Sequence, residues 1–351
     1  AWAKSRKRGS AHRAEKILRR MEQLYYIKGD VSVKPNAVTY AAVMDAWCRN
    51  RQRDRTPTNS NSNNSTSTST MQSPPHRAED ILNRMEFRYQ QSGGSDRDVE
   101  PDIVVYNSVL HAWAKHGKQI PDAPFRAEAI LRRMVQRYAD GVTRVKPDVQ
   151  TYNIVLDGWA NADVELWGSG AAERAEQILM QMEGAFLNAT KAYMYASSTK
   201  RYSDNFRMKE YDAVLKECIV PTTISYNTVI HAWMRFMKDQ VLSSKKTKHS
   251  SEGSGGGSSS SRVASVNANT VAMVAQRAEA ILDRMCSFQY YPDDDDHARE
   301  KDFAYAFAKP DEVTFKLVQD MWTMAGKARR AGAIRERQKL FLTRSSRLEH
   351  A

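Results

Sequence analysis

Apolar side chains recur along the chain with the spacing of amphipathic α-helices. One pattern begins at an aromatic residue and ends at a tryptophan seven residues later, as from Tyr106 to Trp113. A second pattern runs from an alanine to a methionine seven residues later, as from Ala127 to Met134. The apolar positions between these ends fall at i+3 and i+4, which places each set on one face of a helix. We call the helices that these patterns predict helix A and helix B.

Both patterns recur, and the repetition predicts the architecture. The tryptophans of helix A, each seven residues after an aromatic residue, are Trp47, Trp113, Trp159, Trp233 and Trp322. Helix B contains Arg-Ala-Glu with a methionine eight residues after the arginine, in the pairs Arg13/Met21, Arg77/Met85, Arg126/Met134, Arg174/Met182 and Arg277/Met285. Stripes this narrow do not stabilise single helices, whereas stacked hairpins bury a continuous core. We predict an all-α fold, an α-solenoid (right-handed superhelix) of tandem helix-turn-helix repeats, with the A helices lining its concave side.

Helix ends also leave signals in the sequence. A proline precedes each helix A, and Asp, Asn or Thr follows it at a position suited to capping. We expect the glutamate of Arg-Ala-Glu in the first turn of helix B, where the helix dipole favours negative charge. The resulting organisation is a partial repeat at 1–36, repeats at 37–102, 103–148, 149–222 and 223–311, and a partial or divergent repeat with a C-terminal tail at 312–351. Because residues 1–4 match residues 112–115, we expect the chain to begin within a helix A of a longer protein.

Several connections are longer than a tight turn and differ in composition. Residues 51–75 are rich in Arg and then in Ser, Thr and Asn, residues 243–261 hold lysines and a Gly/Ser tract, and residues 286–309 include four consecutive aspartates. Such segments bury too little apolar surface to fold, so we expect long disordered insertions there. We assign residues 183–219 to a further insertion. An extra helix built on its aromatic residues is the alternative interpretation of this segment.

Charge and cysteine content narrow the functional classes. The chain has 53 Lys and Arg against 41 Asp and Glu, and this net charge of +12 favours an acidic partner such as nucleic acid. No run of 18 apolar residues is present, so we expect no membrane-spanning helix. The three cysteines lie far apart without a CxxC motif, which argues against a disulfide scaffold or a zinc finger. Deaminase zinc motifs and two-metal carboxylate clusters are missing, so we expect no enzyme activity, cofactor, metal or small-molecule substrate.

The repeats resemble the pentatricopeptide repeat family of RNA-binding solenoids. The family's Tyr-Asn at the start of helix A occurs at 106–107, 152–153 and 226–227, and its Pro-Asp before helix A occurs at 101–102, 147–148 and 310–311. The alanine-to-methionine spacing of helix B matches as well, whereas the signature of tetratricopeptide repeats is absent. The resemblance implies binding of single-stranded RNA and residence in a mitochondrion or plastid.

By this resemblance, each repeat binds one base between adjacent A helices through three positions. The residue after the aromatic contacts the base edge and is Ala41, Asn107, Asn153, Asn227 or Lys316. The residue immediately before the next helix A contacts the same edge and is Asp102, Asp148, Thr222 or Asp311, with Asn36 before the first copy. The residue two before the aromatic covers the flat face of the base and is Val38, Val104, Gln150, Ile224 or Val313.

The combinations of these residues predict a pyrimidine-leaning target. By resemblance, Asn107–Asp148 and Asn227–Asp311 prefer uridine, and Asn153–Thr222 has a weaker pyrimidine preference. The pair Ala41–Asp102 lacks the amide and selects poorly. Capping alone also explains the residues before helix A, and capping and base contact can coexist.

Three functional hypotheses remain open from the sequence. The first is a single-stranded RNA adaptor in organellar RNA processing, stability or translation. The second is a protein-interaction scaffold, for example one associated with an organellar ribosome, whose basic surface meets RNA without reading bases. The third is the recognition part of a larger nuclease or editing enzyme with its catalytic domain outside this chain.

Overall fold

A computed structural model of the chain describes residues 9–49, 73–199, 218–251, 259–287 and 308–349. Within these ranges the regular structure consists of helices, without a β-strand. The helices belong to two compact units, Ala1–Gly158 and Trp159–Ala351, with the boundary inside one helix. None of the helices in the described ranges has the length and apolar composition needed to cross a membrane.

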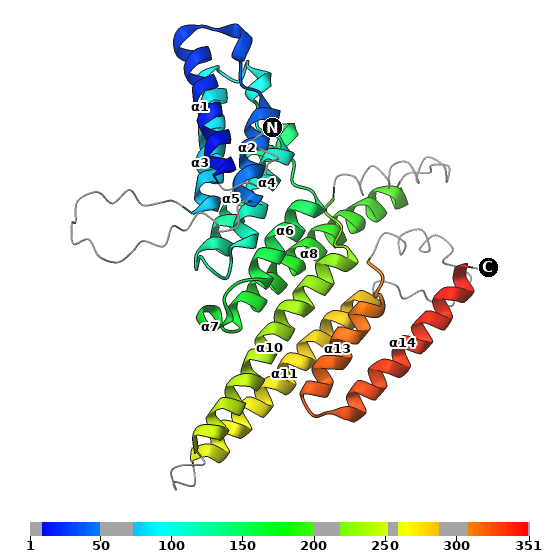
Figure 1. Cartoon of the computed structure of the whole chain (residues 1–351). Helices are drawn as coiled ribbons and strands as arrows, with labels where there is room; N and C mark the ends of the chain where they lie inside the picture. The colour runs from blue at the N-terminus through cyan, green and yellow to red at the C-terminus, as the bar shows by residue number, and fades with distance from the viewer. Residues whose placement is uncertain (1–8, 50–72, 200–217, 252–258, 288–307, 350–351) are drawn as a thin grey trace. The chain divides into compact units, whose positions relative to one another are not determined.

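The first unit alternates B and A helices (Figure 1). Its B helices are α1 (Ser10–Lys28), α3 (Pro74–Gln91) and α5 (Ala123–Ala139), and its A helices are α2 (Ala37–Arg49), α4 (Ile103–Lys115) and α6 (Val149–Ala160). The 3₁₀-helices Val31–Val33, Arg97–Val99 and Thr143–Val145 precede α2, α4 and α6. Helices α2 and α4 each pack against the B helix before and the B helix after them, and also against each other.

The second unit continues the alternation (Figure 1). After the short α7 (Val164–Trp167) come the B helices α8 (Gly170–Thr199), α11 (Ser259–Ser287) and α14 (Ala328–Glu349), and the A helices α10 (Thr223–Ser251) and α13 (Glu312–Met324). Helix α10 packs against α8, α11 and α13, and α13 packs against α11 and α14. The predicted all-α fold of helix-turn-helix repeats is confirmed, while the handedness of the superhelix stays a prediction.

The predicted apolar stripes form the core of both units. Tyr106, Val109 and Trp113 of α4 are fully buried, as are Ala127 and Met134 of α5. The equivalent residues of α10 and α11 are buried in the same way. Because each stripe covers one face of its helix, a helix A is sandwiched between two B helices, and burial of its apolar area stabilises the stack.

The glutamate of Arg-Ala-Glu lies elsewhere than predicted. Helix B begins about a turn or more before the motif, so these glutamates are not in the first turn; Glu15, for instance, follows the α1 start at Ser10 by five residues. Its carboxylate instead accepts a hydrogen bond from the indole of the next helix A. This Trp–Glu hydrogen bond recurs as Trp47–Glu15 (3.0 Å), Trp113–Glu79 (3.0 Å), Trp233–Glu176 (3.0 Å) and Trp322–Glu279 (2.9 Å). The helix-dipole prediction was therefore wrong, because a buried donor on the next helix A outweighs a partial charge at the helix end.

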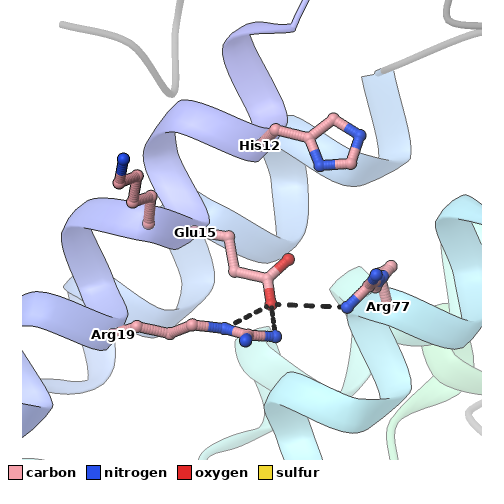
Figure 2. A pocket seen from close by; sticks show the side chains of 5 residues that line it. His12, Glu15, Arg19 and Arg77 are labelled. Carbon is pink, nitrogen blue, oxygen red and sulfur yellow. Dashed lines mark hydrogen bonds and ion pairs between the residues drawn. The ribbon is translucent and has the colours of Figure 1, made fainter. Parts of the chain in front are cut away.

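The arginine of the motif binds the glutamate of the preceding repeat. Figure 2 shows the Glu15 carboxylate between Arg19 of the same helix, at 2.7 Å, and Arg77 of α3, at 3.9 Å. His12 and Lys16 join these residues around a pocket of about 240 Å³. The equivalent ion pairs are Arg126–Glu79 (3.8 Å), Arg277–Glu176 (3.6 Å) and Arg330–Glu279 (3.6 Å). Each Trp–Glu hydrogen bond thus lies beside an ion pair that joins successive B helices.

A second acidic position follows the first by seven residues. Here Glu22 accepts a hydrogen bond from the Tyr40 hydroxyl at 2.8 Å, and Glu86 accepts one from the Tyr106 hydroxyl. In the second unit, burial and then the charge of Glu183 raise the pKa of Tyr226. The carboxylate is missing in two places: Cys286 precedes Phe315, which has no hydroxyl, and Val135 precedes Tyr152, although Tyr152 does carry a hydroxyl. Burial alone raises the pKa of Tyr152.

Two predicted insertions are partly helical. Residues 183–199, which we expected to be inserted chain, extend α8, and Phe186 is fully buried there because it continues the apolar stripe of the helix. In the predicted insertion 243–261, α10 continues to Ser251 and α11 begins at Ser259. As whole elements, these two helices pack against each other.

The other insertions lie mostly outside the described residues. Of the predicted insertion 51–75, Pro74 and Pro75 already belong to α3, since proline is tolerated in a first helical turn. Residues 50–72, 200–217, 252–258 and 288–307 are outside the described ranges, so disorder in the remainder of the four insertions stays a prediction.

We predict that Glu176→Ala lowers the free energy of unfolding by about 2–3 kcal/mol, because it leaves the buried Trp233 indole and two arginines without their carboxylate. Denaturant titration measures this change. The control Glu336→Ala removes an exposed carboxylate paired with Lys339 and should cost less than about 0.5 kcal/mol. Equal losses in the two variants would refute a special role for the buried carboxylate.

The variants Tyr40→Phe and Tyr152→Phe separate the second acidic position from simple burial. Loss of the Tyr40 hydroxyl, which binds Glu22, should cost about 0.5–1.5 kcal/mol. For Tyr152, the second acidic position of the preceding helix B is Val135 and not a glutamate. Loss of the Tyr152 hydroxyl should therefore cost less than about 0.5 kcal/mol. Thermal and denaturant unfolding test this order, and the reverse order contradicts it.

Candidate nucleic-acid interface

The residues before the A helices act as N-caps. Side-chain oxygens accept the backbone N–H three residues later in Asn36–Thr39 (3.0 Å), Asp102–Val105 (3.0 Å), Asp148–Thr151 (2.8 Å) and Asp311–Thr314 (2.8 Å). Thr222 lies at the same position before α10, where its N–H donates to the Ser225 hydroxyl at 3.0 Å. The capping interpretation is confirmed for the first four, and each cap fixes a polar group at the start of a helix A.

The positions two residues before the aromatics are exposed, although most carry apolar side chains. The exposed fractions are 75% for Val38, 60% for Val104, 65% for Ile224 and 54% for Val313, and Gln150 is exposed as well. All five lie in the first turn of an A helix, next to the capping residue. Aliphatic side chains in this place leave an apolar surface that suits the flat face of a base.

The positions after the aromatics are accessible without being fully exposed. Asn107, Asn153 and Asn227 are half-buried, as is Ala41, whereas Lys316 is exposed. Each asparagine follows a tyrosine of the buried stripe along the helix, so its side chain lies at the edge of the core. A half-buried amide is held in place by its neighbours and still reaches a ligand.

In the second unit the predicted pair comes together directly. The amide nitrogen of Asn227 on α10 donates to the carboxylate of Asp311 before α13, over 3.2 Å. The hydroxyl of Thr314 lies 2.7 Å from the amide oxygen of Asn227 and 2.7 Å from the same Asp311 oxygen. Residues 84 positions apart in the chain thus form one polar cluster between neighbouring A helices.

The first unit repeats the two threonine contacts of this arrangement. The Thr151 hydroxyl lies 2.9 Å from the amide oxygen of Asn107 and 2.8 Å from the carboxylate of Asp148. Ala41, one repeat earlier, offers no polar group to Asp102. The remaining pair, Asn153 and Thr222, has one residue in each unit, and it stays a prediction.

Hydrogen bonds keep the Asp311 carboxylate ionised. Burial by itself raises its pKa, but the Thr314 N–H, the Thr314 hydroxyl and the Asn227 amide all stabilise the charged form and together lower the pKa below its ordinary value. At neutral pH the cluster therefore presents an acceptor, the carboxylate, beside a donor, the amide N–H. Adjacent donors and acceptors are what the edge of a nucleobase presents in complementary form.

Sequence reasoning missed Thr151 and Thr314. Both are fully buried at the third position of their helices, where their hydroxyls also accept the N–H of the capping aspartate. The signal was the Asp-x-x-Thr pattern of a capping box, which shows the contact within the helix start but not the contact with the preceding A helix.

The site holds no sign of metal chemistry. Among the described residues, histidine, cysteine, aspartate and glutamate nowhere gather in a group of three or more that suits a metal ion.

A comparison with protein families identifies the repeats. The model described as pentatricopeptide repeat domain matches residues 94–162, which include α4, α5 and α6 with Asn107, Asp148 and Asn153. No curated protein matches the chain. The predicted resemblance is confirmed for residues 94–162, which match a pentatricopeptide repeat domain.

The lowered pKa of Asp311 predicts how its cap responds to pH. A carboxylate with a depressed folded pKa contributes stability above its unfolded pKa, about 3.9 for aspartate, and loses it as the pH falls through the folded pKa. Asp311→Ala should therefore cost about 0.5–2 kcal/mol, constantly from about pH 5 to 8, and the cost should shrink below about pH 4. Urea denaturation at several pH values measures it. A cost that disappears between pH 5 and 7 contradicts the prediction.

Proposed function

We propose that the chain binds single-stranded RNA sequence-selectively, with uridine favoured at Asn107–Asp148 and Asn227–Asp311, and acts in RNA processing, stability or translation in a mitochondrion or plastid. The pentatricopeptide repeat domain at 94–162 supports RNA binding in general. The observation that carries the sequence-selective part is the polar cluster that joins asparagine and aspartate of neighbouring A helices, which has the same composition in both units.

The chemistry of the cluster favours uracil. Its edge has an N3–H donor flanked by two carbonyl oxygens, so the carboxylate of Asp311 accepts from N3–H while the Asn227 amide donates to a neighbouring carbonyl. Because a carbonyl lies on either side of N3–H, the asparagine amide can donate to either carbonyl while the carboxylate accepts from N3–H. Thr222, which lacks a carboxylate, is a weaker acceptor than Asp148 or Asp311.

The faces of the base are covered by the exposed aliphatic residues of the first turns. Val104 and Ile224 contribute apolar area that does not depend on which base is bound. This contact adds affinity without selectivity, so the edge contacts determine the preference. The net charge of +12 adds attraction to phosphates, and we expect affinity to fall as salt rises.

The test compares RNA decamers of uridine and of adenosine by fluorescence anisotropy. We expect tighter binding to the uridine decamer, and the double variant Asn107→Ala/Asn227→Ala should lose about tenfold or more in affinity for it. The affinity of the double variant for the adenosine decamer should fall by a smaller factor. Measurement at two salt concentrations separates the phosphate contribution.

Asn83→Ala is the matched control, since it removes an exposed asparagine from α3, a helix B that lies outside the proposed base-binding positions. Its affinity for both decamers should equal that of the wild type. Equal binding of the two decamers by the wild type, or an unchanged preference in the double variant, contradicts the proposal. The chain would then act as a scaffold whose basic surface does not read bases.

A further inference from the structure

We propose that Thr151 and Thr314 are positioning residues that determine which end of an asparagine amide faces the base. This inference rests on the proposed function and deepens it, since it assigns the orientation of the groups that read uridine. It concerns two buried hydroxyls that do not themselves reach a ligand.

The geometry around Thr314 leaves the amide of Asn227 one favourable orientation. The hydroxyl oxygen is 2.7 Å from the amide oxygen, and the amide nitrogen donates to Asp311 at 3.2 Å. The single hydroxyl hydrogen is shared between the amide oxygen and the Asp311 oxygen, also 2.7 Å away. Turning the amide by 180° would place its oxygen against the carboxylate, where two acceptors repel each other.

Thr151 holds Asn107 in the same way in the other unit. Its hydroxyl lies 2.9 Å from the amide oxygen and 2.8 Å from Asp148. With the oxygen engaged inside the cluster, the part of the amide left to contact a base is its N–H donors. The two clusters, built from different repeats, therefore both present amide N–H donors to a base.

The orientation matters because an amide can act as donor or acceptor. Held as a donor beside the carboxylate, it fits a uracil carbonyl next to N3–H. Turned over, it becomes a second acceptor, which repels that carbonyl and accepts the amino group of cytosine or adenine instead. Without the hydroxyl, the carboxylate alone opposes the turned orientation, so the amide adopts it more often and the preference for uracil decreases.

One repeat shows that the cap itself does not require a hydroxyl at this position. Val105 occupies the third position of α4, and its N–H still donates to Asp102 at 3.0 Å. The preceding A helix there carries Ala41, which has no amide to orient. A hydroxyl accompanies the asparagine in both clusters and is missing where the asparagine is missing.

The experiment measures affinities for uridine, cytidine and adenosine decamers in Thr151→Val/Thr314→Val. The ratio of uridine to cytidine affinity should fall by about fivefold or more relative to the wild type. The double variant Thr151→Ser/Thr314→Ser retains both hydroxyls and should keep the wild-type ratio. A purely structural role predicts instead that valine lowers affinity for all three decamers by the same factor.

Thr39→Val is the matched control. The Thr39 hydroxyl donates to the capping Asn36 at 2.8 Å, and the described part of the chain has no preceding helix A whose asparagine it could orient. This variant should lower the melting temperature like a single valine variant of the pair and leave the uridine-to-cytidine ratio unchanged. An equal loss of ratio in Thr39→Val overturns the proposal.

A measurement without RNA keeps the two proposals distinguishable. With selectively ¹⁵N-labelled asparagine, the side-chain amide signals of Asn107 and Asn227 should shift in Thr151→Val/Thr314→Val and stay unchanged in Thr39→Val. Unshifted signals, or a wild-type ratio in the valine variant, overturn the role of the threonines alone. Failure of the wild type to bind any decamer overturns the proposed function, and the base-reading role of the threonines with it.

Discussion

The stack of helices depends on the hydrogen bond between a helix-A tryptophan and a glutamate of the preceding helix B. The indole N–H is buried with its ring and has to be paired, because an unpaired donor in the interior costs about 1–3 kcal/mol. Glu176 and Trp233 are 57 residues apart, yet they meet at 3.0 Å. The neighbouring arginine of the next helix B binds the same carboxylate, so three helices are tied at one point. This contact holds the helix A against the preceding helix B in α2, α4, α10 and α13, and the residues after the tyrosines lie at the edge of the core.

The second acidic position shows how closely the local chemistry follows the partner. Glu22 and Glu86 occur where the next helix A supplies a tyrosine hydroxyl, whereas Cys286 occurs before Phe315. A carboxylate opposite phenylalanine would be buried without a donor, which costs more than the interaction gains. The second position thus matches its partner at these three places but not at Val135, which precedes Tyr152, while the Trp–Glu hydrogen bond occurs in both units.

Local patterns predicted much of the fold and part of the site. The spacing from Tyr106 to Trp113 identified the buried face, and the residue after each proline identified the caps, because both depend on neighbours within one helix. The role of Glu79 was missed, since its partner Trp113 is 34 residues away. The extensions of α10 and α11 were missed because composition describes a segment by itself and not against a partner helix. Thr314 was missed because its cap contact is visible in the sequence and its contact with Asn227 is not.

The central claim is that RNA bases lie between the starts of neighbouring A helices. Crosslinking with an oligonucleotide that carries 4-thiouridine, followed by mass spectrometry of the crosslinked peptides, tests this placement most directly. The account predicts crosslinks in the first two turns of α4 and α10, at residues 103–109 and 223–229. Crosslinks confined to the B helices α3, α5 or α11 would contradict it.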